Sequence, residues 1–417
     1  MTTRRTFIQQ SGLALFGIGI GGIPQFVQAA VHSQKQMQAL GKKKVLVCIF
    51  QRGAMDGLMA VTPFADAYLK AARPTLFLEA GNGKALYDLD GKYGLHPALK
   101  GFANLYQSKQ LAIVHGMGSP NTTRSHFDAQ DYMEAGTPYN KGTNTGWLNR
   151  ATGLIKHDNS PFKAVSLTTS LPKSFYGDNP TIAINNLQDF AIQLKGNKLG
   201  ANVAAASFEE LYDNTSNTLL KETSKESFEA IKILEKASVK NYTPSNQASY
   251  PTTALGNALK QIAQLIKMDV GLQIAFAESG GWDTHFNQGT INGTFARNAT
   301  DLSNSITALW TDLGQLQDEV TIMTMTEFGR TVKQNGTGGT DHGRASCNFI
   351  VGNNVQGGIV HGTVPILSKD NLADGRDLPV TTDFRAIFSE VANKHLKIND
   401  NKILFPDYTG GTIGVMK

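Results

Sequence analysis

Four short apolar runs, rich in β-branched residues, constrain the fold of this chain more than any other feature. They are KVLVCIF (44–50), QLAIVHGMG (110–118), VGLQIAFAESG (270–280) and EVTIMTMTEF (319–328). Runs that are apolar at successive positions are typical of strands buried on both faces. Stretches with apolar residues at helical spacing alternate with these runs, at 96–108, 299–317 and 383–396. The alternation predicts an α/β fold with a mainly parallel central sheet flanked by helices.

A second type of segment lies between the second and third runs. Residues 205–268 are polar and helical in pattern, with a loose linker, NYTPSNQASY, inside them. They predict a helical insertion that caps the sheet of a large domain spanning 44–417.

The N-terminus has the pattern of an export signal. Arg4 and Arg5 precede an apolar, glycine-interrupted stretch, and Val27-Gln28-Ala29 forms a small-residue cleavage site before Ala30. TTRRTF resembles the SxRRxF motif of twin-arginine signal peptides, which implies export of a folded protein by that machinery. We therefore expect a signal peptide at 1–30, a polar leader at 31–43 and a periplasmic or secreted product. A basic anchor that stays in the inner membrane is the alternative, but Pro24 breaks the apolar stretch, and no stable membrane span is expected in the mature form.

Charge and cysteine content exclude several classes of function. Without residues 1–30, the 39 basic residues lose two arginines and face 34 acidic residues, which leaves a net charge of +3. So small a charge, with no run of Lys and Arg, argues against a nucleic-acid partner. Cys48 and Cys347 are too few for a cysteine metal cluster, and we expect two buried free thiols.

Carboxylates and imidazoles follow two of the predicted strands. Asp283 and His285 stand two apart in GGWDTH, so an extended backbone points both side chains the same way. Asp341 and His342 form a second pair in TDHG, and Glu327 follows the last apolar run. If the pairs meet in space, they form a mixed nitrogen and oxygen site for Zn²⁺, or for Ca²⁺ or Mg²⁺. Hydrogen bonds that order the turns are the alternative.

Hydroxyls and arginines also lie just beyond the strand ends. Ser125, with Thr122 and Thr123 before it, precedes a helical stretch, where a hydroxyl serves either as a nucleophile or as a helix cap. Arg52 and Arg330, like Arg124, suit a tetrahedral anion, with pairing to Asp56 or Glu327 as the alternative.

Other polar residues near these positions favour structural roles. Taken singly, His115, His126 and His361 are better interpreted as structural histidines. Asp128, Asp131 and Glu134 recur every three residues and predict a solvated helix surface.

Several motifs occur in an order that resembles a known family. They are RGAMDGL, SHFDAQDYMEAG, GWLNR, GGWDTH, TEFGRT, GTDHG and TDFRAIFSEV, spread over about 44–396. On these motifs the chain resembles the exported bacterial proteins of the domain-of-unknown-function 1501 family, within the alkaline phosphatase and sulfatase-like superfamily.

The resemblance implies an alkaline phosphatase-like sandwich with one or two metals at the strand ends and a Thr, Ser or modified Cys nucleophile. Asp283, His285 and His342 resemble metal ligands of the superfamily, although a longer spacing than D-x-H is usual there. Glu327 and Phe328 replace a usual Asp-His pair, and the acid after the first strand comes late, as Asp56. The cysteine signature of sulfatases is absent from the sequence.

Three functions follow as hypotheses. The first is an exported metal-dependent hydrolase of phosphate or sulfate esters, on small-molecule or polysaccharide substrates, with Ser125 or Thr123 as nucleophile and Arg52 or Arg330 stabilising charge. The second is a non-catalytic exported binding or assembly protein that keeps the fold. The third, an oxidoreductase, is suggested only by the export route.

Overall fold

The computed structural model describes residues 43–81, 85–156, 160–187 and 242–417. The predicted signal peptide and nearly all of the polar leader lie outside these residues, as does 205–241, the larger part of the predicted insertion. Within the described residues, no helix is long and apolar enough to cross a membrane.

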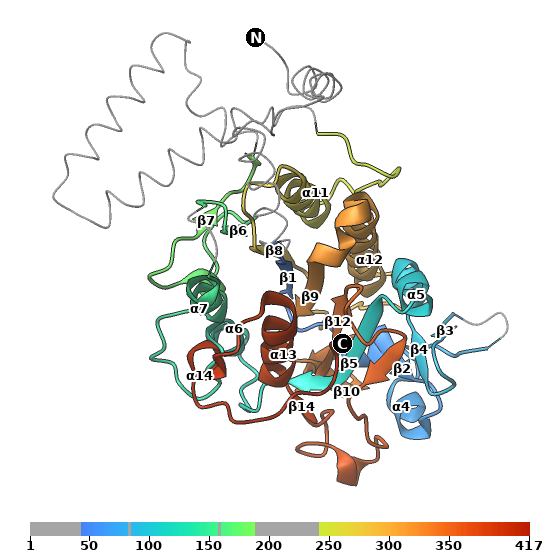
Figure 1. The fold of residues 1–417 in the computed structure, drawn as a ribbon. Helices are drawn as coiled ribbons and strands as arrows, with labels where there is room; N and C mark the ends of the chain where they lie inside the picture. Colours follow the sequence, from blue (N-terminus) through green and yellow to red (C-terminus); the bar gives the residue numbers. More distant parts are fainter. Residues whose placement is uncertain (1–42, 82–84, 157–159, 188–241) are drawn as a thin grey trace, which may run out of the picture. The chain divides into compact units, whose positions relative to one another are not determined.

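One large sheet forms the centre of the fold (Figure 1). Its strands run in the order β13-β5-β12-β9-β1-β8-β6-β7, and β14 also pairs with β5. Among these described strands, β12 alone is antiparallel to its neighbours. The strands are β1 (Val45–Gln51), β5 (Leu111–Gly118), β6 (Ala164–Ser166), β7 (Ile182–Ala183), β8 (Ile274–Ser279), β9 (Val320–Met325), β12 (Ser346–Val351), β13 (Ile359–His361) and β14 (Thr382–Asp383).

The four apolar runs form the middle strands β1, β5, β8 and β9, and all residues of β1, β5 and β9 are buried. The predicted α/β class with a mainly parallel sheet and flanking helices is therefore confirmed. β1 lies between β9 and β8, with Cys48 opposite Met323 on one side and Phe276 on the other. Cys48 and Cys347 are free and buried, as predicted.

Helices cover both faces of the sheet (Figure 1). Alternate residues of β1 point to opposite faces of the sheet and belong to two separate cores. The first core contains Val45, Val47 and Ile49, and the second contains Leu46, Cys48 and Phe50. The first core is completed by α5 (Lys100–Gln107), α11 (Ala254–Lys267) and α12 (Thr294–Leu313), and the second by α6 (His126–Ala135), α7 (Trp147–Leu154), α13 (Phe384–Leu396) and α14 (Asn401–Leu404). Each fully buried aliphatic side chain contributes about 1.5–3 kcal/mol, so both cores stabilise the sheet strongly.

The helical predictions at 96–108, 299–317 and 383–396 correspond to the 3₁₀ turn η1 (Pro97–Leu99) with α5, to α12 with η4 (Gly314–Glu319), and to α13. Helix α11 is the described end of the predicted insertion, and it packs against α12 and β8 in the first core.

Smaller elements surround the sheet. A three-stranded sheet joins β2 (Val61–Pro63), β4 (Tyr93–Leu95) and β3 (Tyr87–Asp88), and a hairpin joins β10 (Arg330–Gln334) to β11 (Thr340–His342). The short helices are α3 (Gly57–Ala60), α4 (Ala67–Ala72), η2 (Lys173–Phe175) and η5 (Lys369–Asn371).

Strand directions bring several connections to one edge of the sheet. The parallel strands β5, β9, β1 and β8 all end there, and the antiparallel β12 begins there. In open α/β sheets this carboxyl edge is where ligand sites form.

Candidate metal centre

The histidines and acids gathered at this edge come from four separate connections. His126 is the first residue of α6, which follows β5. Asp283 and His285 follow β8, and Glu327 follows β9. His342 ends β11, just before β12 begins. Residues up to 216 positions apart in the sequence therefore lie side by side.

The glycine-rich stretch before β12 is a hairpin where the sequence predicted a loop. Arg330 on β10 pairs with His342 on β11. Gly343 follows His342, and its backbone lies so close to that of Arg330 that a Cβ at this position would be 2.4 Å from the Arg330 carbonyl carbon. The hairpin fixes the direction of the His342 ring, which a mobile loop would not do.

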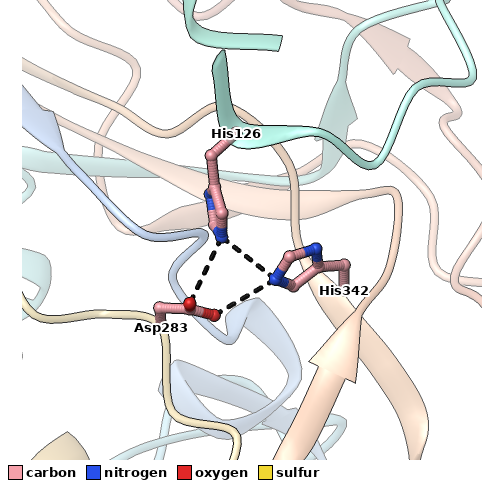
Figure 2. A group of neighbouring side chains, drawn as sticks. All are labelled: His126, Asp283 and His342. Carbon is pink, nitrogen blue, oxygen red and sulfur yellow. Dashed lines mark hydrogen bonds and ion pairs between the residues drawn. The ribbon is translucent and has the colours of Figure 1, made fainter. Parts of the chain in front are cut away.

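Two imidazoles and one carboxylate, those of His126, His342 and Asp283, form a group whose ligand atoms all lie within 4.8 Å of one another (Figure 2), and His285 lies beside this group. Nε2 of His342 lies 3.0 Å from Nε2 of His126 and 2.8 Å from Nε2 of His285. The Asp283 carboxylate lies 3.3 Å from His342 Nε2 and 3.4 Å from His126 Nε2. It also lies 3.1 Å from His285 Nε2, so the two predicted Asp/His pairs do meet.

Each of these imidazoles uses its other nitrogen, Nδ1, to contact an oxygen that can only accept. Nδ1 of His126 lies 2.8 Å from Glu327 Oε1, and Nδ1 of His285 lies 3.0 Å from Asp341 Oδ1. Nδ1 of His342 lies 2.8 Å from the backbone carbonyl of Arg124. These acceptors assign the proton to Nδ1, so in the neutral rings the Nε2 lone pair of His342 faces those of His126 and His285.

A bound cation fits this arrangement of ring nitrogens better than hydrogen bonds between the rings do. Two unprotonated Nε2 atoms repel each other at 2.8–3.0 Å, whereas a bound ion accepts all of the lone pairs at once. Four ligands at 2.0–2.1 Å around tetrahedral Zn²⁺ are separated by about 3.3 Å. The separations among His126, His342 and Asp283, 3.0–3.4 Å, are close to that value, and His285 Nε2 lies 2.8 Å from His342 Nε2 at the side of this group.

The charges around the cluster also favour a cation. Among the described residues, the carboxylates of Asp283, Glu327 and Asp341 face one guanidinium in direct contact, that of Arg330, which leaves two negative charges. Burial acts to raise the pKa of Asp283, but the hydrogen bond and charge of Arg330 outweigh it, so the pKa is below its usual value. The carboxylate therefore stays ionised at neutral pH.

The surroundings of His126 and His342 shift the pKa values of the two rings in opposite directions. The hydrogen bond to Glu327 raises the pKa of His126. Burial lowers the pKa of His342, which favours its neutral, ligating form.

Glu327 and Asp341, both predicted as metal ligands, lie behind the histidines. Oε1 of Glu327 accepts from His126, from Gln130 Nε2 at 2.9 Å and from the backbone N–H of Gly53 at 2.8 Å. Asp341 contacts His285 and accepts from Asn335 at 3.1 Å. Both carboxylates orient imidazoles, which is the usual role of an outer partner in a metal site.

The predicted arginines differ in what they contact. Arg330 is buried and donates to Asp283 Oδ1 at 2.6 Å and to the carbonyl of Thr340, so it borders the cluster. Arg52 donates to Glu134 and Glu278 and reaches the cluster only through Gln130.

Arg124 pairs with Asp374 and Asp377, while its backbone carbonyl holds His342. In the described residues, Arg52, Arg124 and Arg330 form ion pairs with acids other than the alternative partners, Asp56 and Glu327. Asp56 is buried and forms an ion pair with Arg73.

The predicted hydroxyls lie beside the cluster residue His126. Ser125 is exposed and is the N-cap of α6, where its Oγ accepts from Asp128 N at a long 3.5 Å. Thr123 Oγ1 accepts from the N–H of Ser125 at 3.2 Å. Both roles considered for Ser125 therefore remain compatible with its position at the positive end of a helix.

His126 is the cluster residue that the sequence did not distinguish from its structural counterparts. His115 is buried with Nε2 at 2.9 Å from the carbonyl of Val61, and His361 contacts the carbonyl of Gln356, as expected of structural histidines. The sequence does offer one indication that His126 belongs to the site, which is its position directly after Ser125, at the start of a helix that follows a buried strand. Glu134 also differs from the expectation of a solvated stripe, because it is buried and pairs with Arg52.

A family model described as "Protein of unknown function (DUF1501)" matches residues 106–404. The chain belongs to the DUF1501 family. None of the curated proteins compared with the chain matches it.

Three solved structures are similar to this DUF1501 protein at low identity. One is the C-terminal periplasmic domain of EcEptC from Escherichia coli in complex with Zn, at 8% identity over 75% of this chain and 74% of that one, with a TM-score of 0.36. Another is the PsFucS1 sulfatase from Pseudoalteromonas sp., at 12% identity over 95% and 78%, with a TM-score of 0.38. The third is alkaline phosphatase from the Antarctic bacterium TAB5, at 13% identity over 75% and 92%, with a TM-score of 0.30.

Proposed function

We propose that this protein is an exported metal-dependent hydrolase of phosphate or sulfate esters. The observation that carries the proposal is the convergence of His126 Nε2, His342 Nε2 and the Asp283 carboxylate, with His285 Nε2 beside His342 and every Nδ1 held by an oxygen acceptor. A divalent ion bound there polarises an ester oxygen and stabilises the charge that develops as the ester is cleaved. Nitrogen-rich ligand sets favour Zn²⁺ over Mg²⁺ or Ca²⁺.

The residues around the ion have separate roles in this proposal. Asp283, His126 and His342 hold the ion, and His285 lies beside them. Arg330 keeps Asp283 ionised and places a buried positive charge beside the anionic group of the substrate.

Arg52 acts through other residues. It holds Gln130 at 3.1 Å, and Gln130 supports Glu327, which orients His126. Arg52 is therefore a positioning residue, although the sequence favoured a direct role in charge stabilisation.

Ser125 is the proposed nucleophile, with Thr123 supporting its backbone. Its Oγ forms a bond to phosphorus or sulfur while the bond to the ester oxygen breaks, and the departing alcohol takes up the serine proton. Water then cleaves the seryl ester, which restores the Ser125 hydroxyl and releases phosphate or sulfate. The N-terminus of α6 favours the negative charge that gathers beside Ser125.

Metal analysis and turnover together test this function. The purified protein is dialysed, its metals are measured by mass spectrometry, and hydrolysis of 4-nitrophenyl phosphate and 4-nitrophenyl sulfate is followed. We expect about one divalent ion per chain and hydrolysis of one of the two esters. A metal-free protein that cleaves either ester, or a metal-loaded one that cleaves no ester in a wider panel of sugar and alkyl esters, contradicts the proposal.

A glycine at position 125 separates the nucleophile from the helix cap. Ser125→Gly removes the hydroxyl but costs the helix only a few tenths of a kcal/mol, because glycine is an acceptable N-cap. Hydrolysis is expected to fall by more than about a hundredfold while metal content is unchanged. Ser108→Gly, at an exposed serine that ends α5, is the matched control and keeps full activity.

One observation favours a second function, a non-catalytic exported binding protein. In the described part of the chain, no side-chain hydroxyl is hydrogen-bonded to the side chains of Asp283, His126, His285 or His342. This alternative predicts metal binding with no turnover, and with the same affinity in Ser125→Gly as in the natural sequence.

A further inference from the structure

A cavity of about 680 Å³ opens at the same edge of the sheet as the metal centre. Its walls come from the residues that follow β6 and β7, from Glu278 in β8, and from helix α11. Because β8 is also the strand that leads to Asp283 and His285, the cavity neighbours the centre along the sheet. Its volume is in the range that holds a small organic ligand.

Side-chain amides and hydroxyls dominate the polar lining of this cavity, which we call the amide cavity. Within the described residues these groups belong to Thr168, Thr169, Asn185, Asn186, Tyr242, Asn257, Gln261 and Gln264. Amides offer both donors and acceptors, as hydroxyl groups do. The charged lining residues, Lys260 and Glu278, are one of each sign, so the cavity has no excess positive charge to select an anion.

Apolar side chains form part of the same lining. Leu167, Leu187 and Ala258 contribute there, and each is less than 9% exposed. A sugar ring presents hydroxyls at its rim and C–H groups on its faces. A mixed wall of amides and aliphatic groups matches that surface better than it matches a phosphate or a wholly apolar ligand.

A continuous chain of hydrogen bonds joins the amide cavity to the metal centre. Glu278 Oε1 accepts two bonds from Arg52, at 2.6 and 3.0 Å. Arg52 donates to Gln130, which donates to Glu327, the residue that orients His126. The wall of the cavity and the metal centre are thus parts of one fixed network.

We propose that the amide cavity binds a neutral sugar unit of the substrate, with the ester to be cleaved placed at the metal centre. The part of this statement that concerns the ester rests on the proposed function, whereas sugar binding in the cavity does not. The substrate class is accordingly a glycan ester, in which an uncharged sugar ring adjoins the esterified position.

Binding to metal-free protein tests the cavity independently of catalysis. The full chain is treated with a chelator, labelled and applied to an array of neutral oligosaccharides of glucose, galactose, mannose and xylose, with sulfated oligosaccharides beside them. We expect binding to a subset of the neutral oligosaccharides, and His342→Ala is expected to bind them equally well. Absence of binding to every neutral oligosaccharide, or binding to sulfated ones alone, overturns the proposal.

Two matched substitutions locate the binding. Asn257→Leu removes an exposed amide in α11 at the cavity, and Asn104→Leu removes an exposed amide in α5 outside it. Titration calorimetry with the tightest neutral oligosaccharide is expected to show affinity about tenfold weaker in Asn257→Leu, the effect of a lost hydrogen bond with its partner left unpaired. Affinity is expected to be unchanged in Asn104→Leu, and equal affinity in both variants contradicts the assignment.

The two proposals fail in distinguishable ways. Neutral sugar binding without ester hydrolysis overturns the proposed function and leaves the cavity assignment standing. Ester hydrolysis by a protein that binds no neutral sugar overturns the cavity assignment alone.

Discussion

Two sets of three histidines in the described residues differ in how the fold uses their ring nitrogens. In the buried set, His96, His115 and His395, Nε2 lies 2.9–3.1 Å from a backbone carbonyl. In the set at the strand ends, His126, His285 and His342, an oxygen contacts Nδ1 instead, and the Nε2 atoms face one another.

The difference decides which rings are available as ligands. Nδ1 of His96 and of His115 each accept a backbone N–H, at 3.1 and 2.9 Å, so both of their nitrogens are occupied. In the rings at the strand ends, the remaining nitrogen faces another ring and the Asp283 carboxylate. Nitrogens and a carboxylate gathered in this way could serve as metal ligands.

The largest expected effect comes from removing the ring at the centre of the metal set. His342→Ala deletes the imidazole that contacts both other rings, so the affinity for Zn²⁺ is expected to fall by more than about a hundredfold, beyond the loss seen for outer partners. Competition with a chromophoric chelator measures this affinity. His361→Ala, at a histidine whose ring is hydrogen-bonded to the carbonyl of Gln356, is the control, and an equal loss in both variants would refute the division into two sets.

The same substitution in the buried set should affect folding and leave the metal in place. His115→Ala opens a cavity and leaves the carbonyl of Val61 without its partner, so the free energy of unfolding is expected to fall by about 2–4 kcal/mol. Urea denaturation of metal-free protein gives this value. The folded variant should bind one ion per chain, and loss of the ion would mean that the two sets are not independent.

Substituting a residue that orients a metal ligand should reduce the metal affinity by a smaller amount. Glu327→Gln keeps an oxygen near His126 Nδ1 but removes the negative charge, so the affinity for Zn²⁺ should fall by about 10–100-fold. Glu319→Gln, at an acid away from the cluster that pairs with Lys44, is the control. Unchanged affinity for Zn²⁺ in Glu327→Gln would show that the contacts at Nδ1 do not affect metal binding.

Acid should unfold the protein through its buried histidines. Burial lowers the pKa of His96, His115 and His395 to about 4, from an ordinary value of 6.5. Between these values the unfolded chain binds protons that the folded chain does not. The free energy of unfolding therefore falls as the pH drops from 6.5 toward 4, by up to about 1.4 kcal/mol per pH unit for each histidine.

Urea titrations of metal-free protein at pH 7, 6 and 5 measure this slope while most carboxylates remain ionised. His115→Gln removes one of the three groups, and its stability should depend less steeply on pH. A flat profile in the natural sequence would show that the buried rings are not held neutral.

The parts of the fold that were predictable from the sequence are those with long apolar runs. Strands β1, β5, β8 and β9 are six to eight residues long and almost wholly buried, so their composition alone indicates them. β6 and β7 have three and two residues, too few for any pattern to identify. The antiparallel direction of β12 depends on the β10–β11 hairpin before it, whose glycines predicted a loop.

The candidate site was predictable in part for a related reason. Asp283 and His285 are two residues apart, so local geometry relates their side chains. His126 belongs to the same site because Glu327, 201 positions away, holds its Nδ1. A contact of that kind has no local signal, which is also why Arg52 and Glu327 could not be recognised as supports for other residues.

The central claim is that His126, His342 and Asp283 bind one divalent ion together, with His285 beside them. X-ray absorption at the zinc edge, on the full chain purified with its native metal exchanged for one equivalent of Zn²⁺, tests it most directly. The account predicts at least two imidazole nitrogens and one oxygen at about 2.0–2.1 Å. A zinc shell with fewer than two imidazoles, or zinc that dialysis removes completely, would contradict it.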